Sequence, residues 1–165
     1  SQFMVMMVSA NTKYDKVLAG NAVYNESEAA GQALFDAKCS SCHQGVLFTD
    51  QSYRNNGLAV DDRYNDVGRK RVTGLEDDKY KFKVPSLRNI AVSLPYMHDG
   101  RFKTLKEVLD HYDEGVVNTP NLDPLMQQGD ELGITLTETE KEQLIAFLNT
   151  LTDDNFLLDP RFSEF

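Results

Sequence analysis

The sequence predicts a mainly α-helical domain. Two capping boxes, Thr104 with Glu107 and Thr137 with Glu140, each precede apolar residues at helical spacing. No segment shows the alternation of polar and apolar residues that is typical of a half-buried strand. The 165 residues are 41% hydrophobic and 26% charged, so the chain has enough apolar side chains for one core and is not disordered.

The first expected helix lies at the start of the chain. Its apolar residues fall on one helical face: Phe3, Met6, Met7 and Ala10. We expect residues 1–20 to form this helix and a linker, within one domain over residues 1–165. Because the chain opens inside a helix, residue 1 is not expected to be the natural start of the gene product.

A second helix is expected from about Glu26 to Lys38, with Asn25 and Glu28 as its capping box. Residues 45–83 are rich in Asn, Asp and Gly and show little periodicity. Such a long irregular stretch in a compact domain is usually functional, or wrapped around something.

Three further helices are expected after residue 83. Pro85 suits the first turn of a short helix over Ser86–Val92. The helix after Thr104 is expected to end near Gly115, and the one after Thr137 continues past residue 148. Their inward residues are expected to be Leu105, Val108, Leu109 and Tyr112 in the first, and Leu144, Ile145, Leu148 and Leu151 in the second.

Charge and hydropathy exclude two classes of partner. Acidic residues outnumber basic ones 26 to 17, giving a net charge of −9. A nucleic-acid interface is therefore not expected, since phosphate contacts need a basic face. No segment has the run of about 18 apolar residues that spans a membrane.

The strongest motif is Cys39-Ser40-Ser41-Cys42-His43, the Cys-x-x-Cys-His signature of c-type haem attachment. Two thiols at this spacing reach the two vinyl groups of one porphyrin and form thioethers with them. His43 then lies under the iron and donates an imidazole nitrogen as the proximal ligand. The motif uses both cysteines of the chain.

Three other interpretations of this motif stay open. A disulfide or a thioredoxin-like pair also gives Cys-x-x-Cys, although the latter needs a βαβ context that the sequence lacks. A zinc site from Cys39, Cys42, His98 and His111 is conceivable, but the spacing matches no common zinc finger or ribbon. The motif could also occur by chance in a protein without haem.

The function of a haem domain depends on what faces the other side of the iron. Methionine favours electron transfer at a raised potential, an open position favours peroxide chemistry, and tyrosine stabilises oxidised iron. The candidates after the motif are Met97, His98, His111, Tyr112 and Met126. Residue types alone do not choose among them, although His111 is expected to face solvent and Met126 to make a plain apolar contact.

Several ordered segments resemble the C-terminal half of bacterial di-haem cytochrome c peroxidases and of the related methylamine-utilisation maturases. The resemblance covers about residues 3–152. The segments that carry it are Asn11–Lys16, the Cys-x-x-Cys-His motif, Phe82–Val92, Pro95–Gly100, Thr104–Val108 and Leu144–Leu148.

This resemblance implies an all-α, cytochrome c-like domain with long irregular loops around one covalent haem c. It also implies a periplasmic enzyme that reduces hydrogen peroxide with electrons from a small cytochrome or copper protein. In that family the N-terminal haem domain holds the peroxidatic iron, and the C-terminal haem receives the electrons. With one motif, this chain matches only the electron-transferring half, and we expect it to be a fragment that lacks the partner haem domain. The catalytic residues are unknown.

The resemblance also implies which residues bind the haem iron. In the peroxidases a helix after the turn that contains His98 supplies a methionine to this haem. The corresponding position here is Tyr112, as in the maturases, which makes Tyr112 the distal candidate and Met97 the alternative. His98 is implied to lie near the haem edge.

Two arginines are candidates from their own chemistry, with ordinary surface ion pairs as the alternative, and a calcium site is implied by the resemblance. Arg88 and Arg101 are candidates to pair with the haem propionates, since arginine binds carboxylates bidentately. The carbonyls of Ser93 and Pro95 match positions that hold a calcium ion between the two domains of the family. The rival functions are a stand-alone monohaem electron carrier and a maturase-like enzyme that oxidises a protein side chain through high-valent iron.

Overall fold

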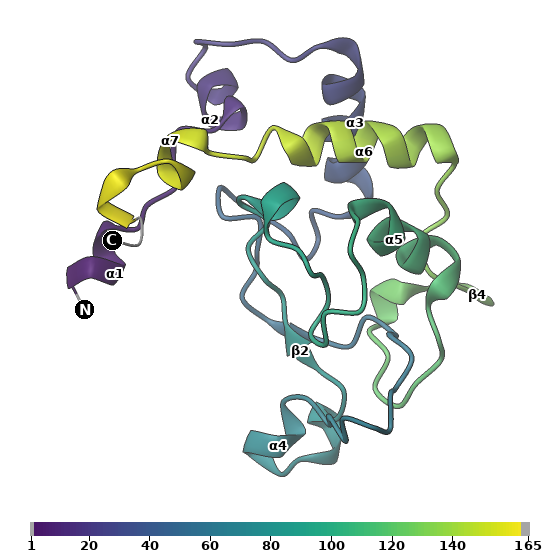
Figure 1. The fold of residues 1–165 in the computed structure, drawn as a ribbon. Helices are drawn as coiled ribbons and strands as arrows, with labels where there is room; N and C mark the ends of the chain where they lie inside the picture. Colours follow the sequence, from purple (N-terminus) through teal and green to yellow (C-terminus); the bar gives the residue numbers. More distant parts are fainter. Residues whose placement is uncertain (1, 163–165) are drawn as a thin grey trace.

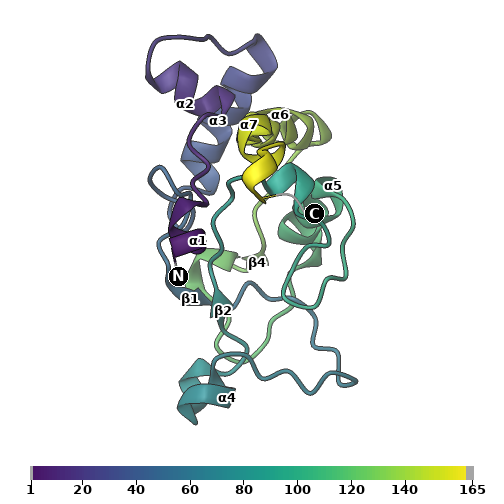
Figure 2. The ribbon, with the colours of Figure 1, turned by 60° about the vertical axis from the view of Figure 1, so that its left-hand side comes forward.

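Two helices far apart in the sequence form the centre of the molecule. The computed structural model describes residues 2–162, and in it α3 (Glu26–Lys38) packs against α6 (Glu138–Asn149). The two helices cross in Figures 1 and 2. Both begin at the capping boxes that the sequence predicts. A mainly helical fold with irregular loops is confirmed.

The next helix changes its winding near its end. α5 (Leu105–Asp110) begins at the Thr104 capping box and continues into one π-helical turn, η3 (His111–Gly115). Gly115 is the last residue of that turn, and Val116 after it is extended. A π turn adds a residue to a helical turn and is frequent at functional sites. The helix therefore reaches Gly115 as predicted, but not as a regular α-helix.

Short elements connect these helices. The remaining helices are α1 (Gln2–Met6), α2 (Lys13–Leu18), α4 (Lys70–Thr73) and α7 (Asp154–Leu157). Single 3₁₀ turns are η1 (Glu76–Asp78), η2 (Ile90–Val92), η4 (Pro124–Met126) and η5 (Pro160–Phe162). The strands are two residues long and form two antiparallel pairs. β1 (Tyr53–Arg54) pairs with β2 (Phe82–Lys83), and β3 (Gln127–Gln128) pairs with β4 (Glu131–Leu132).

Two local predictions were wrong. The short helix expected over Ser86–Val92 is only the 3₁₀ turn Ile90–Val92, because Asn89 has a left-handed φ of 60° that an α-helix does not accommodate. The first helix ends at Met6, and α2 occupies part of the expected linker. Within residues 2–162, no helix combines the length and apolarity needed to cross a membrane.

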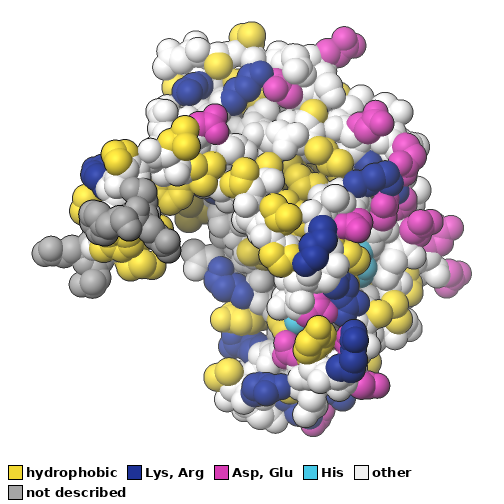
Figure 3. Space-filling model, in the orientation of Figure 1, with side chains coloured by type: hydrophobic (Ala, Val, Ile, Leu, Met, Phe, Trp, Pro, Cys, Tyr) yellow, Lys and Arg dark blue, Asp and Glu magenta, His cyan; other side chains and the backbone are white. Residues whose placement is uncertain are grey.

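A buried lysine joins three of these elements. Lys141 of α6 has a side chain only 5% exposed, and its Nζ lies 2.7 Å from Asp110 of α5 and 2.8 Å from Asp113 of η3. It also lies 3.0 Å from Glu138 in its own helix. Figure 3 shows acidic side chains gathered along the right-hand edge of this face of the molecule. The lysine neutralises carboxylates that the fold brings together, and it ties the π turn to α6.

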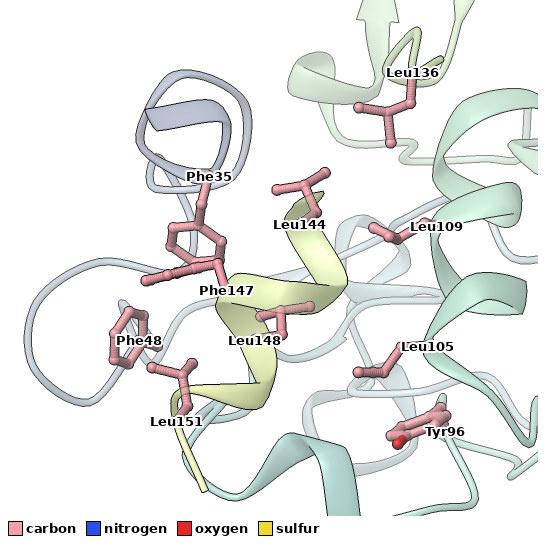
Figure 4. Packing of buried hydrophobic residues seen from close by; sticks show 10 residues of the cluster. All are labelled: Phe35, Phe48, Tyr96, Leu105, Leu109, Leu136, Leu144, Phe147, Leu148 and Leu151. Carbon is pink, nitrogen blue, oxygen red and sulfur yellow. The ribbon is translucent and has the colours of Figure 1, made fainter. Parts of the chain in front are cut away.

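The core lies around α6, as Figure 4 shows. The Phe147 ring meets the Phe35 ring of α3, with 5.2 Å between their centroids. Leu144 and Leu148 are buried as predicted, and Leu151 just after the helix is fully buried. Leu105 and Leu109 of α5 belong to the same cluster. The core thus spans three helices: α3, which ends at the cysteine motif, α6, and α5, which continues into the turn that carries Tyr112.

The two ends of the described chain meet. The buried Asp153 carboxylate accepts hydrogen bonds from the backbone N–H of Asn11, at 2.9 Å, and from the Ser9 hydroxyl, at 3.2 Å. The Asn89 side chain bridges the same residues, since its Oδ1 accepts from the Asp153 backbone N–H and its Nδ2 donates to the Ser9 hydroxyl. These bonds hold Asn89 in its left-handed conformation.

Candidate haem-binding site

The cysteine motif forms a tight turn at the end of α3. Cys39 caps the helix, and its carbonyl accepts the backbone N–H groups of Cys42, at 3.2 Å, and His43, at 3.0 Å. The two thiols are free, so the disulfide interpretation is not supported. Burial raises the pKa of Cys39 to about 12 and also raises that of Cys42. Cys39 packs against the core, which places the motif beside the apolar centre of the domain.

The His43 ring is held in one orientation by the loop that follows it. Its Nδ1 lies 3.0 Å from the carbonyl oxygen of Phe48, a buried residue with a positive φ of 53°. A ring N–H that donates to this carbonyl leaves the lone pair on Nε2. Burial lowers the pKa of His43, which favours the neutral ring. This is the tautomer in which Nε2 can bind iron.

Tyr112 is brought to the same region by the π turn. Burial is the main effect on its phenol and raises its pKa, and the Cys39 and Cys42 thiols raise it further. A hydrogen bond from the Asn56 side chain acts in the opposite direction. The Tyr112 carbonyl accepts the backbone N–H of Ile134 at 2.6 Å. The structure thus brings Tyr112 within electrostatic reach of both cysteines.

Met97 lies beside the same asparagine. The Asn56 Nδ2 is 3.5 Å from the Met97 sulfur. The same side chain lowers the pKa of the Tyr112 phenol, against the effect of burial. By contrast, Met126 is 8% exposed in η4, in line with the apolar contact expected for it.

Two residues of the site could not be identified from the sequence, and both lie in the irregular segment 45–83. Asn56 is the first. The second is Arg54, whose positive charge lowers the pKa of Cys42 and whose guanidinium binds Asp50 and Asp123 at 2.8 and 2.9 Å. The only sequence signal was the length of the segment, which indicates a functional loop but names no residue.

The orientation predicted for His111 was wrong. Its side chain is buried, at 5% exposed, and its Nε2 lies 3.1 Å from the Asn56 carbonyl oxygen. The loop that contains Asn56 covers this side of η3, where a regular surface helix would meet solvent. Burial lowers the pKa of His111.

His98 and Arg101 lie near one another on the loop before α5. The His98 ring stacks on Phe82, with centroids 3.6 Å apart and planes 9° apart. Arg101 binds Asp99 at 2.6 Å, and its other contact is to the Ala59 carbonyl oxygen at 2.8 Å. A role at the haem edge for His98 and Arg101 stays a prediction.

Arg88 forms a bidentate ion pair inside the protein. Its two Nη atoms lie 2.9 and 2.7 Å from the Asp15 carboxylate oxygens, and its Nε donates to the Val46 carbonyl. Asp15 also completes the capping box of α2 with Thr12. The pairing of Arg88 with a propionate stays a prediction, and here the guanidinium joins α2 to the loop after the cysteine motif.

This ion pair makes stability depend on pH. The Arg88 hydrogen bond is the main reason why the pKa of Asp15 falls to about 2. The stabilisation is complete above the ordinary pKa near 4 and is lost as the pH falls towards 2. We expect Asp15→Asn to lower the free energy of unfolding by about 2 kcal/mol at pH 7, and the gap to wild type to close between pH 4 and 2. Urea unfolding across this range measures it, with the exposed Asp62→Asn as the control. A gap that does not change with pH would contradict the assignment.

Two metal predictions have different outcomes. Among residues 2–162, no group of three or more His, Cys, Asp or Glu side chains is placed to hold a metal ion. The zinc interpretation of Cys39, Cys42, His98 and His111 is therefore not supported. Ser93 and Pro95 are exposed in the loop after η2, and their calcium role stays a prediction.

The residues present fit a covalent haem. The site offers two free thiols and a neutral imidazole with a directed lone pair. It also offers two further donors, the half-buried phenol of Tyr112 and the thioether of Met97. Thiols and imidazole in this order are the attachment and proximal groups of haem c. The donor set is thus the one expected of a c-type cytochrome.

Comparison with known proteins agrees with a c-type cytochrome. The profile of the cytochrome c family matches residues 28–152. The chain therefore belongs to the cytochrome c family, and this implies a covalent haem c. It is similar to the methylamine utilization protein MauG of Methylorubrum extorquens, with 36% identity over 157 residues that cover 90% of this chain and 41% of that protein. It is also similar to the cytochrome c551 peroxidase of Nitrosomonas europaea, with 32% identity over 158 residues, covering 93% of this chain and 43% of that protein.

Solved structures extend the comparison. A MauG-like protein associated with microbial copper homeostasis has a TM-score of 0.80 and 37% identity, covering 94% of this chain and 52% of its own. The diheme peroxidase BthA from Burkholderia thailandensis E264 shares the fold, with a TM-score of 0.73, 22% identity, and coverage of 99% and 51%. The expected resemblance to di-haem peroxidases and MauG is confirmed. The chain spans less than half the length of the curated relatives it matches.

Proposed function

We propose that this chain carries one haem c and serves as the electron-transferring domain of a di-haem, peroxidase-like oxidoreductase. The observation that carries this proposal is the turn at the end of α3, where two free thiols precede an imidazole whose Nδ1 is bound to a carbonyl. Cys39 and Cys42 would hold the porphyrin as thioethers, and His43 would bind the iron. The group supplies a one-electron carrier, and the buried residues around it limit its contact with water.

In the whole protein, electrons from a small cytochrome or copper protein pass through this domain to a partner haem domain. There one hydrogen peroxide takes two electrons and two protons and gives two molecules of water. The proposal includes a periplasmic location and a calcium ion at the carbonyls of Ser93 and Pro95. It is supported by the similarity to bacterial cytochrome c peroxidases, whose length the chain covers only in part.

A maturase-like role is the second candidate, and Tyr112 favours it. The resemblance implies tyrosine in the maturases where the peroxidases have methionine. Tyr112 is half-buried and lies within electrostatic reach of both cysteines. The similarity to MauG supports the same reading. We therefore propose Tyr112 as the distal ligand, with Met97 as the alternative.

Haem attachment tests the main proposal. The whole chain is produced in bacteria that attach haem c, and the mass and absorption of the denatured protein are measured. We expect one covalent haem in wild type and none in the double variant Cys39→Ser/Cys42→Ser. The control is Ser41→Ala, which changes an exposed residue between the cysteines and should keep the haem. A colourless wild-type protein would overturn the proposal.

The oxidised spectrum of the same samples tests the distal ligand. A methionine–iron charge-transfer band in the far red would overturn Tyr112 and assign Met97. A spectrum without this band, and unlike that of His/Met ligation, supports phenolate ligation and the maturase-like role.

A further inference from the structure

Tyr112 leaves the helical face on which its spacing places it. Leu105 and Leu109 of α5 lie seven and three positions before it, and a regular α-helix would direct all three side chains to one face. The core cluster of the described residues includes both leucines but not Tyr112. The π turn η3 begins one residue earlier, at His111, and its wider winding changes the register of the side chains that it carries. The direction of Tyr112 therefore depends on the π turn.

The chain after β4 lies directly against this turn. The Ile134 backbone N–H donates to the Tyr112 carbonyl oxygen at 2.6 Å. The Leu136 N–H donates to the Asp113 carboxylate at 3.0 Å. Gly133 makes the close approach possible, because a Cβ there would lie 2.6 Å from the Tyr112 carbonyl oxygen and 2.7 Å from that of Asp113. Since η3 is the last turn of the helix, these donors replace those that a further turn would supply.

The Asp113 carboxylate also ties the π turn to α6. Its Oδ2 lies 2.8 Å from the buried Lys141 ammonium, while its Oδ1 accepts the Leu136 N–H. The Asp113 side chain is 18% exposed, so both contacts are largely shielded from water. Lys141 also pairs with Asp110 at 2.7 Å, but Asp110 lies in α5, before the π turn begins. Asp113 therefore joins the turn to two other segments of the chain.

We propose that Asp113 and Gly133 are positioning residues that hold the π turn in the form that directs Tyr112 to the distal side of the haem iron. This inference rests on the proposed function, since it requires the attached haem with Tyr112 as its ligand. Both residues act through the backbone of the turn. When their contacts are removed, the winding can become regular, and Tyr112 then shares the face of Leu105 and Leu109 and leaves the site.

The test is the binding of imidazole to the ferric whole chain with haem attached, followed by absorption. Imidazole binds only protein whose distal position is free, so its apparent affinity reports the ratio of Tyr112-bound to Tyr112-free protein. Asp113→Ala removes both contacts of the carboxylate, and we expect imidazole to bind about tenfold or more tightly, the effect of losing one charge-assisted hydrogen bond. Asp113→Asn keeps an acceptor for Leu136 and should have a smaller effect. Gly133→Ala should act at least as strongly as Asp113→Ala, because its Cβ separates the two segments.

Two controls separate positioning from a general loss of stability. Asp110→Asn also takes one carboxylate from Lys141, but outside the π turn, so imidazole should bind it as it binds wild type. In the Tyr112→Phe background, the Asp113 and Gly133 variants should change imidazole binding no further, because the phenol is absent. If Gly133→Ala does not fold, the two Asp113 variants decide the test.

Three results would each overturn the inference. They are wild-type imidazole binding in Asp113→Ala, an equal change in Asp110→Asn, and a methionine–iron band in the wild-type spectrum. Absence of covalent haem from wild type would instead overturn the proposed function.

Discussion

Gly31→Ala is expected to lower the free energy of unfolding by about 3 kcal/mol or more, or to prevent folding. Gly31 lies in α3 where it crosses α6, and a Cβ there would sit 2.0 Å from the Gln143 carbonyl oxygen and 2.9 Å from the Phe147 Cβ. The carbonyl belongs to the backbone of α6 and does not move aside, so the two helices must separate. Overpacking of this kind costs more than the roughly 1 kcal/mol that alanine gains over glycine in helix propensity.

Urea unfolding followed by circular dichroism measures this effect. Ser27→Ala, at an exposed site in the same helix, is the control and should change stability by no more than about 0.5 kcal/mol. Because α3 ends at Cys39, separation of the helices should also reduce the yield of haem-bearing protein. A Gly31→Ala protein as stable as wild type would show that the crossing is looser than the structure describes.

Lys141→Met is expected to cost about 2 kcal/mol. The Lys141 ammonium is buried, and hydrogen bonds from it to Asp110, Asp113 and Glu138 raise its pKa, so it is charged at neutral pH. Methionine fills the space but removes the buried cation that these carboxylates share. The loss is below the 3–5 kcal/mol typical of a broken buried pair because the carboxylates keep part of their contact with water.

Lys106→Met is a matched control for this experiment. Lys106 also binds Asp110 and Glu138, but its side chain is 53% exposed, and exposed ion pairs contribute little. Urea unfolding of both variants should show a loss for Lys141→Met and almost none for Lys106→Met. Equal losses in the two variants would show that the burial of Lys141 does not determine its contribution to the free energy of unfolding.

The local features of this fold could be predicted from the sequence, because their causes are local. A capping box involves residues three positions apart, and α3, α5 and α6 each begin at one. The haem motif lies within five residues, so its chemistry follows from its spacing.

The contacts that shape the site could not be predicted, because they join distant residues. Pro85 predicted a helix over Ser86–Val92. Hydrogen bonds of the Asn89 side chain with Ser9 and Asp153 instead hold Asn89 in a left-handed conformation, which an α-helix does not accommodate. His111 has the spacing of a surface residue and is buried by a loop 55 residues earlier in the chain. Asn56 stands in no motif, and only the folded chain shows what it contacts.

The distance along the chain between α3 and α6 determines when the cysteines gain their surroundings. α3 ends at Lys38, whereas its partner helix begins only at Glu138, so a growing chain displays the Cys-x-x-Cys-His segment long before α6 has been made. During synthesis the thiols lie on an unpacked, accessible chain, whereas the finished fold packs Cys39 against the core. Contacts between such distant segments form slowly. The order of synthesis therefore leaves an interval in which an attachment enzyme can reach both sulfurs before Cys39 packs against the core.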